Sequence, residues 1–353
     1  MNLPFLKLTQ TQEDWQAAFA FQVFHRPAEE WLKMRWGFNA GALLEEALDR
    51  YKLFIESQSI NELEFQTGAL QNNTLALRGI YSPESGLKMA LLGKSCASSR
   101  EQAKQTAQQY AREVFSTFPH DFLLEPAKTE DAYRQLGGDQ LLGRNLNVVQ
   151  VQRGILSLPA TNGPHYLMGA WQASPRSNEQ IWRALSAMPQ AVLFNILIRP
   201  SVLFAVEKHA LLEMKKSISA PDENEAITAY LPWAENYLKR RLEPWKRFFL
   251  AQIHLVGDGK MENLVRSVGS ALTRDSNELA LPGYQARYPD PGAQTQTWRE
   301  NIRSLEFTEG SLHLDDIADL EEVFSIFRFP YRQEAGLPGA NFKDLDKEPD
   351  SMQ

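Results

Sequence analysis

The chain has 353 residues, of which 43% are hydrophobic and 10% aromatic, a composition typical of folded globular proteins. This length favours two or three domains. The formal net charge of -7 excludes a protein whose whole surface is a nucleic-acid footprint, because phosphate binding depends on lysine and arginine. A local basic face is still compatible with that total.

Cysteine content and hydropathy predict where the protein resides. The single cysteine, Cys96, cannot form an intrachain disulfide, which is typical of intracellular proteins. The most apolar run, 191–198, is too short for a membrane helix and contains Asn195. The N-terminus has no apolar signal-peptide segment. We therefore expect a cytoplasmic protein without membrane insertion.

Residues 1–60 are expected to form an N-terminal helical arm. Aromatic side chains are frequent over 15–38, and the apolar residues of 42–55 fall on one helical stripe. Such a stripe packs either on the protein's own core or on a partner, and the sequence leaves both alternatives open.

Residues 61–138 are expected to form a first α+β module. The stretch from Lys88 to Leu124 predicts a strand, a long helix and a second strand, with a capping-box-like start near Ser99 and a stop at Pro119. Two strands, 62–67 and 74–81, are expected before it. The apolar residues of the helix recur with a helical period at Ala103, Ala107, Tyr110, Ala111, Val114, Phe115 and Phe118.

Residues 139–274 are expected to form a second α+β module with a helical insertion. Strands are expected at 147–158, 165–171, 191–198 and 248–256, and helices at 178–188, 202–216, 224–244 and 261–272, the third interrupted at Pro232. A strand, a tight turn and an amphipathic helix thus occur at 88–118 and again at 248–272. The pattern predicts an α+β fold of ferredoxin-like β-α-β layers in two related modules with additional helices.

Residues 275–340 follow as a loop, a final helix and a docking segment. The region 275–300 is rich in Pro, Gly, Asn, Gln and Thr, and 315–327 has an apolar stripe opposite an acidic face. The charged tail 341–353 is expected to be disordered. The proposed docking segment, expected to be exposed, comprises Phe327, Arg328, Phe329, Pro330, Tyr331, Leu337, Pro338 and Gly339.

Local motifs give little support for chemistry. Gly93-Lys94-Ser95 looks like the end of a P-loop, but the earlier glycine is replaced by Lys88, so we expect an ordinary strand there and no ATP hydrolysis through these residues. The six histidines show no metal-ligand spacing, and we predict neither a metal site nor a cofactor. The acidic pairs Asp315-Asp316 and Glu321-Glu322 are expected to form a solvated helix face. We predict a non-enzyme, with an active site assembled from distant residues as the alternative.

One dense basic cluster occurs, interleaved with Trp233, Tyr237 and Trp245. Its cations are Lys239, Arg240, Arg241, Lys246 and Arg247. Such a combination can hold a phosphate backbone and stack a base. The favoured interpretation is instead a set of amphipathic cations beside core aromatic residues, because the total charge is negative and prolines interrupt the basic stripe.

The chain resembles the region that precedes the motor domain in P-loop DNA-translocase ATPases of the HerA and FtsK superfamily, including relatives of the conjugative secretion ATPases. Three stretches carry the resemblance: 91–95 with 100–103 and 115–119, 188–200 with Glu207, and 324–330 with 336–339. The motor motifs that the family places after Gly339 do not occur before Gln353, so no catalytic residue carries over.

The resemblance implies a non-catalytic accessory or adaptor subunit of a separate HerA/FtsK-like ATPase. The process served would be DNA processing, conjugation or defence against foreign DNA, with DNA reached through the partner. A ring-shaped motor would by analogy make the adaptor a homo-oligomer. The alternatives are direct DNA binding through 233–247 and an enzyme without a recognisable motif.

Overall fold

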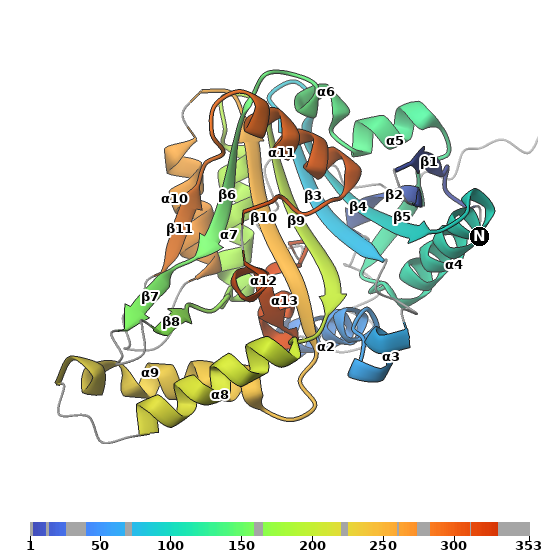
Figure 1. Ribbon diagram of the computed structural model, residues 1–353. Coiled ribbons are helices and arrows are strands. Elements are labelled where there is room, and N and C mark those ends of the chain that lie inside the picture. Colours follow the sequence, from blue (N-terminus) through green and yellow to red (C-terminus); the bar gives the residue numbers. More distant parts are fainter. Residues whose placement is uncertain are drawn as a thin grey trace, which may run out of the picture.

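The computed structural model describes residues 3–11, 14–25, 40–67, 73–158, 165–219, 225–259, 261–273, 283–310 and 312–330. A large antiparallel sheet runs through these residues, and helices cover both of its faces (Figure 1). The predicted α+β class is confirmed.

The first half of the sheet is a β-α-β-β-α-β unit of the ferredoxin-like kind. Its elements are β2 (Trp15–His25), α2 (Ala40–Ser57), β3 (Thr74–Ser82), β4 (Gly86–Ala97), α4 (Arg100–Thr117) and β5 (Phe122–Pro126). The strands lie in the order β5-β2-β4-β3, and each neighbouring pair is antiparallel. Strand β1 (Lys7–Gln10) continues the outer edge beside β2.

The second half repeats this order of elements. It contains β6 (Asn147–Arg153), α7 (Pro175–Ser186), β9 (Val192–Ser201), β10 (Phe248–Gly257), α10 (Glu262–Leu272) and β11 (Tyr284–Arg287), with sheet order β11-β6-β10-β9. The hairpin β7 (Ile155–Leu158) and β8 (His165–Met168) and the helices α8 (Ala205–Ser219) and α9 (Glu225–Leu242) are insertions. The repeat expected at 88–118 and 248–272 is therefore β4-α4 and β10-α10.

The two modules are joined into one sheet through the equivalent edge strands β3 and β9. Their antiparallel register runs from Leu75 opposite Ile198 to Tyr81 opposite Val192. Helix α7 of the second module also packs on β3 of the first. A Cβ on Gly79 would lie 2.6 Å from the ring of Trp182, so glycine allows the indole to lie directly on the strand.

Each face of the sheet has its own layer of helices. On one face α2, α4, α7, α10 and α13 (Leu320–Ile326) bury a core that includes Phe19 and Phe21 of β2. On the other face, where β2 presents Ala18 and Ala20, the short helices α5 (Glu130–Leu136) and α6 (Asp139–Leu142) and helix α11 (Ala293–Ser304) lie against the sheet. No helix in the described ranges is both long and apolar enough to cross a membrane.

Helix α4 forms where the sequence predicts it. The Ser99 side chain accepts a hydrogen bond from the Gln102 N–H and caps the first turn. Ala103 and Ala107 are fully buried, because small side chains let the helix lie close to the strands. Phe115 is an exception to the predicted stripe, since 39% of its surface is exposed.

Several expected elements differ in the structure. The N-terminal region is not a separate helical arm, because β2 lies inside the sheet between β4 and β5. Residues 62–67 form a helix, α3 (Glu62–Thr67), and not a strand. The reason is a reciprocal cap: the Glu64 N–H donates to Asn61 Oδ1 over 2.9 Å, and the Asn61 N–H donates to the Glu64 carboxylate over 2.7 Å.

The expected final helix is divided into three elements. These are α12 (His313–Asp316), β12 (Ile317–Asp319) and α13. Strand β12 pairs with the start of β10, and a capping box between Asp319 and Glu322 then starts α13. The expected loop over 275–300 contains β11 and most of α11 where it is described, and the expected disordered tail lies outside the described residues.

Candidate functional site

The part of the proposed docking segment that is described lies in the core. Phe327 and Phe329 are completely buried, and Arg328 is 2% exposed. The ring of Phe329 packs against those of Phe118, Phe122 and Trp182. The expectation of an exposed segment is therefore wrong for 327–330, because these aromatic residues complete the main hydrophobic core.

Polar contacts hold the same stretch in place. Arg328 Nη2 donates to the carbonyl of Ala173 over 2.7 Å, and the guanidinium lies 5.1 Å from the centre of the Phe324 ring. The carbonyl of Pro330 is bonded to His25 Nε2. The other proposed docking residues, Tyr331, Leu337, Pro338 and Gly339, lie outside the described residues.

Two arginines of the basic cluster are part of an internal ion network. Arg241 is 2% exposed, and its Nη1 atom lies 2.8 Å from Glu322 Oε2 and 3.7 Å from Asp319 Oδ2. Arg240 reaches the same two carboxylates at 3.1 and 3.2 Å. Arg153 of β6 adds a third guanidinium, 2.8 Å from Glu322 Oε1. These arginines connect α9 and β6 to the segment that carries β12 and α13.

The network controls the charge of Glu322. Burial alone would raise the pKa of this fully buried carboxyl, but Arg241, Arg153 and Arg240 together hold its pKa far below the usual range. Glu322 is therefore ionised at neutral pH and is not on a solvated face as expected. Asp316, which is 9% exposed, also departs from that expectation.

The rest of the basic cluster is mostly paired as well. Lys246 lies 3.2 Å from Glu243, and Arg247 lies 3.3 Å from Glu56. Lys239 is exposed and has no ionic partner among the described residues. The aromatic residues Trp233 and Tyr237 are core residues of a cluster between α8, α9 and the start of β10. This arrangement agrees with the favoured interpretation of amphipathic cations beside a core.

Trp245 differs from its neighbours because 98% of its side chain is exposed. It lies in the turn between α9 and β10 with φ of 66°, a left-handed conformation that costs roughly 1–2 kcal/mol for a residue with a side chain. Arg247, two residues later, ties the turn to the segment directly after α2, since its Nη1 atom donates to Ser59 Oγ over 3.1 Å.

Other exposed apolar side chains lie on elements connected to this turn. We define the Trp245 surface as Trp245, Leu53, Leu63, Phe204 and Val206, whose exposed fractions range from 42% to 98%. The rings of Phe65 and Phe204 are 6.1 Å apart, and Lys208 pairs with Glu62, so α3 and the start of α8 are neighbours. Figure 1 shows α2, α3 and α8 together at one end of the sheet.

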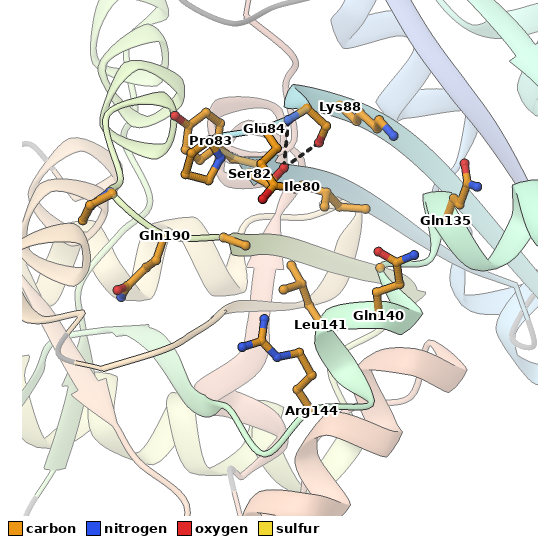
Figure 2. Close-up of a pocket in the computed structure, with 15 residues that line it drawn as sticks. Ile80, Ser82, Pro83, Glu84, Lys88, Gln135, Gln140, Leu141, Arg144 and Gln190 are labelled. Atoms are coloured by element: carbon orange, nitrogen blue, oxygen red, sulfur yellow. Dashed lines mark hydrogen bonds between the residues drawn. The ribbon is translucent and has the colours of Figure 1, made fainter.

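A second feature is a cavity of about 630 Å³ where the two modules meet, called here the junction cavity. Its walls come from the β3-β4 hairpin of the first module, from 189–191 before β9 of the second, and from the α5-α6 connection (Figure 2). Its polar lining includes Glu84, Lys88, Gln135, Gln140, Arg144 and Gln190.

The α5-α6 corner depends on glycine. Gly138 has φ of +69°, and a Cβ there would lie 2.4 Å from Leu193 Cδ1, so the corner lies directly on the sheet. A module boundary is expected at this position, but no local motif of the sequence predicts a cavity. The adjacent glycines Gly137 and Gly138 are the feature that could have indicated a close backbone approach.

Among the described residues, the lining of the junction cavity contains one carboxylate, Glu84, and no histidine. Burial lowers the pKa of His254 to about 3 and raises the pKa of Asp316 to about 7. His254 Nε2 bonds to Thr308, and Asp316 accepts a hydrogen bond from Gln252. Both groups belong to a buried polar cluster outside the cavity lining.

The remaining motifs are structural. Gly93, Lys94 and Ser95 lie inside β4, where Lys94 pairs with Glu306 and Ser95 donates to Asn73 over 2.6 Å. Within the described residues no three His, Cys, Asp or Glu side chains group as metal ligands. A scan against protein-family models gives no match for the chain, and a search of curated proteins gives none.

Proposed function

We propose that this protein is a non-catalytic accessory or adaptor subunit that docks on a separate P-loop ATPase of the HerA/FtsK type and serves DNA processing, conjugation or defence against foreign DNA. The resemblance of three sequence stretches to the non-motor region of such ATPases suggests the partner. The Trp245 surface supports docking, and it replaces 327–330 as the contact region.

The strained backbone of Trp245 is the observation that carries the proposal. A fully exposed indole gains nothing from the hydrophobic core, and its left-handed backbone lowers stability. Tryptophan is among the residues most often found at the energetic centre of protein interfaces. Exposed apolar side chains on α2, on α3 and at the start of α8 add apolar surface on elements that Arg247 and the Phe65–Phe204 contact link to this turn.

Substitution of Trp245 by glycine tests this role. Glycine adopts positive φ without strain, so Trp245→Gly should leave the protein at least as stable as the wild type. A tagged wild-type protein, recovered from its native host, should retain a P-loop ATPase in near-stoichiometric amount, and Trp245→Gly should lose it. Mass spectrometry identifies the retained protein, and the ATPase rate of the eluate is measured with and without DNA.

Tyr288→Ala is the matched control, because Tyr288 is 57% exposed and lies outside the Trp245 surface. It should retain the partner at the wild-type level. Recovery of the wild-type chain alone would refute the adaptor proposal, and equal recovery of the ATPase with Trp245→Gly would refute the Trp245 surface as the contact region. Turnover by the purified chain alone would favour the enzyme alternative.

A further inference from the structure

We propose that the junction cavity binds a nucleotide that carries more than one phosphate group. A volume of about 630 Å³ lies within the range of small-molecule sites, and such sites occur preferentially between domains. The cavity lies at the Val192 end of β9, whereas the Trp245 turn precedes Phe248, which pairs with Ser201 at the other end. The two surfaces can therefore be tested separately.

The charge of the lining favours a phosphate ligand. Lys88 of β4 and Arg144 after α6 make no salt bridge or side-chain hydrogen bond with any described residue. Figure 2 shows the two side chains on different walls of the cavity. Cations form their strongest hydrogen bonds with phosphate and carboxylate oxygens, and two separated cations fit phosphates spread over several ångströms.

The amides of the lining favour a nucleobase. Gln135 and Gln140 offer both donors and acceptors that no described residue uses. A glutamine amide can form a bidentate pair with the edge of adenine, in which it donates one hydrogen bond and accepts another. Ile80, Leu141 and Ala191 add apolar surface on which a planar ring can lie.

The remaining polar groups fit a sugar. Glu84 in the β3-β4 turn is the carboxylate of the lining, and a carboxylate accepts hydrogen bonds from hydroxyl groups. The neighbouring Ser82 and Ser85 hydroxyls bond to each other at 2.6 Å, which fixes the turn (Figure 2).

Sheet pairing argues against a peptide as the ligand. An extended peptide commonly binds by adding a strand to an open sheet edge. Strand β3 is paired with β4 and β9, β4 is also paired with β2, and β9 is also paired with β10. Within the described residues, β3, which forms much of the lining, therefore leaves no free edge for a peptide.

Calorimetric titration of the full-length protein tests the proposal. The probes are ATP, ADP, AMP, inorganic tripolyphosphate and a short fluorescein-labelled oligothymidylate, the last followed by fluorescence polarisation. We expect ATP to bind more tightly than ADP, ADP more tightly than AMP, and tripolyphosphate more weakly than ATP. Lys88→Gln or Arg144→Gln should each weaken ATP binding about tenfold, and the double variant about a hundredfold.

A charge-matched double variant, Lys104→Gln with Arg112→Gln, removes two exposed cations of α4 on the opposite face of the sheet and should bind ATP like the wild type. An oligonucleotide that binds more tightly than ATP, with the same loss in Lys88→Gln and Arg144→Gln, would identify a nucleotide unit of a single strand as the ligand. The proposal is overturned by absence of binding to both ATP and the oligonucleotide, by equal loss in the control, or by tripolyphosphate binding as tightly as ATP.

Discussion

The arginines around Glu322 and the cations of the junction cavity represent two different uses of positive charge. Arg153, Arg240 and Arg241 surround carboxylates that are at most 1% exposed. Lys88 and Arg144 face a cavity and have no carboxylate partner among the described residues. The first group holds the insertion and the C-terminal segment on the sheet, and the second is available to a ligand.

This difference shows why the density of cations along a sequence is a poor guide to a binding surface. The cluster 239–247 is the densest, but α9 directs its arginines toward β12 and α13, where acids neutralise them. The cavity takes one cation each from two distant elements, so no local pattern marks it. Net positive potential depends on which charges remain unpaired after folding.

The largest expected effect comes from Glu322→Gln. Removal of the carboxylate leaves three guanidinium groups close together with one remaining acid, and breaking a buried ion network in this way costs about 3–5 kcal/mol of unfolding free energy. Urea denaturation measures this loss. Glu321→Gln, at the exposed neighbouring position, should change stability by less than about 1 kcal/mol.

The pH dependence of Glu322 follows from its low pKa. The unfolded chain takes up a proton near the usual pKa of glutamate while the folded protein stays ionised, so stability is lost as the pH falls through the acidic range. The wild type should therefore lose more stability than Glu322→Gln on acidification. Parallel acid-unfolding curves for the two proteins would contradict the assignment.

Arg241→Gln should give the second-largest loss, about 2–3 kcal/mol, because Arg153 and Arg240 still neutralise Glu322. Lys239→Gln, two positions earlier and exposed, should leave the urea midpoint unchanged. A comparison of these two variants distinguishes cations that stabilise the fold from cations that bind DNA. If both variants keep full stability and both reduce salt-sensitive DNA binding, the internal role of the cluster is wrong.

Asp316 should have a smaller effect on stability than Glu322, and its pH dependence should have the opposite sign. Burial raises its folded pKa to about 7, although Gln252 and Arg153 oppose the shift, so ionisation destabilises the fold as the pH rises. Between pH 5 and 8 the wild type should lose about 1–3 kcal/mol relative to Asp316→Asn, which has no proton to release. Asp49→Asn, at an exposed site, should show the wild-type pH profile.

Much of the fold could be predicted from periodicity. Helix α4 follows from its alanine and aromatic stripe, and the two modules follow from the repeated strand-helix order. Periodicity does not predict strand β2, because its buried run, Ala17 to Phe21, lacks the polar alternation of a half-exposed strand. The sequence predicts a strand in place of helix α3 because polar and apolar residues alternate over 62–67, and the cap at Asn61 outweighs that pattern.

The sites could be predicted much less well. Phe327 and Phe329 look like a linear docking motif, and only the tertiary structure shows that both are buried and that Phe329 packs against Phe118 and Trp182. Trp245 lies within the basic segment of the sequence, but its exposure depends on the turn that follows α9. The junction cavity depends on the pairing of β3 with β9, which no local motif encodes.

The smallest expected effect on stability belongs to the double variant Lys88→Gln with Arg144→Gln. Because neither cation has a partner among the described residues, their removal leaves no described buried carboxylate unpaired, and the unfolding free energy should change by less than about 0.5 kcal/mol. Urea denaturation without ligand measures this value, and the same titration with ATP should stabilise the wild type but not the variant. A loss comparable to that of Arg241→Gln would show that these cations are structural, and the contrast between the two groups would disappear.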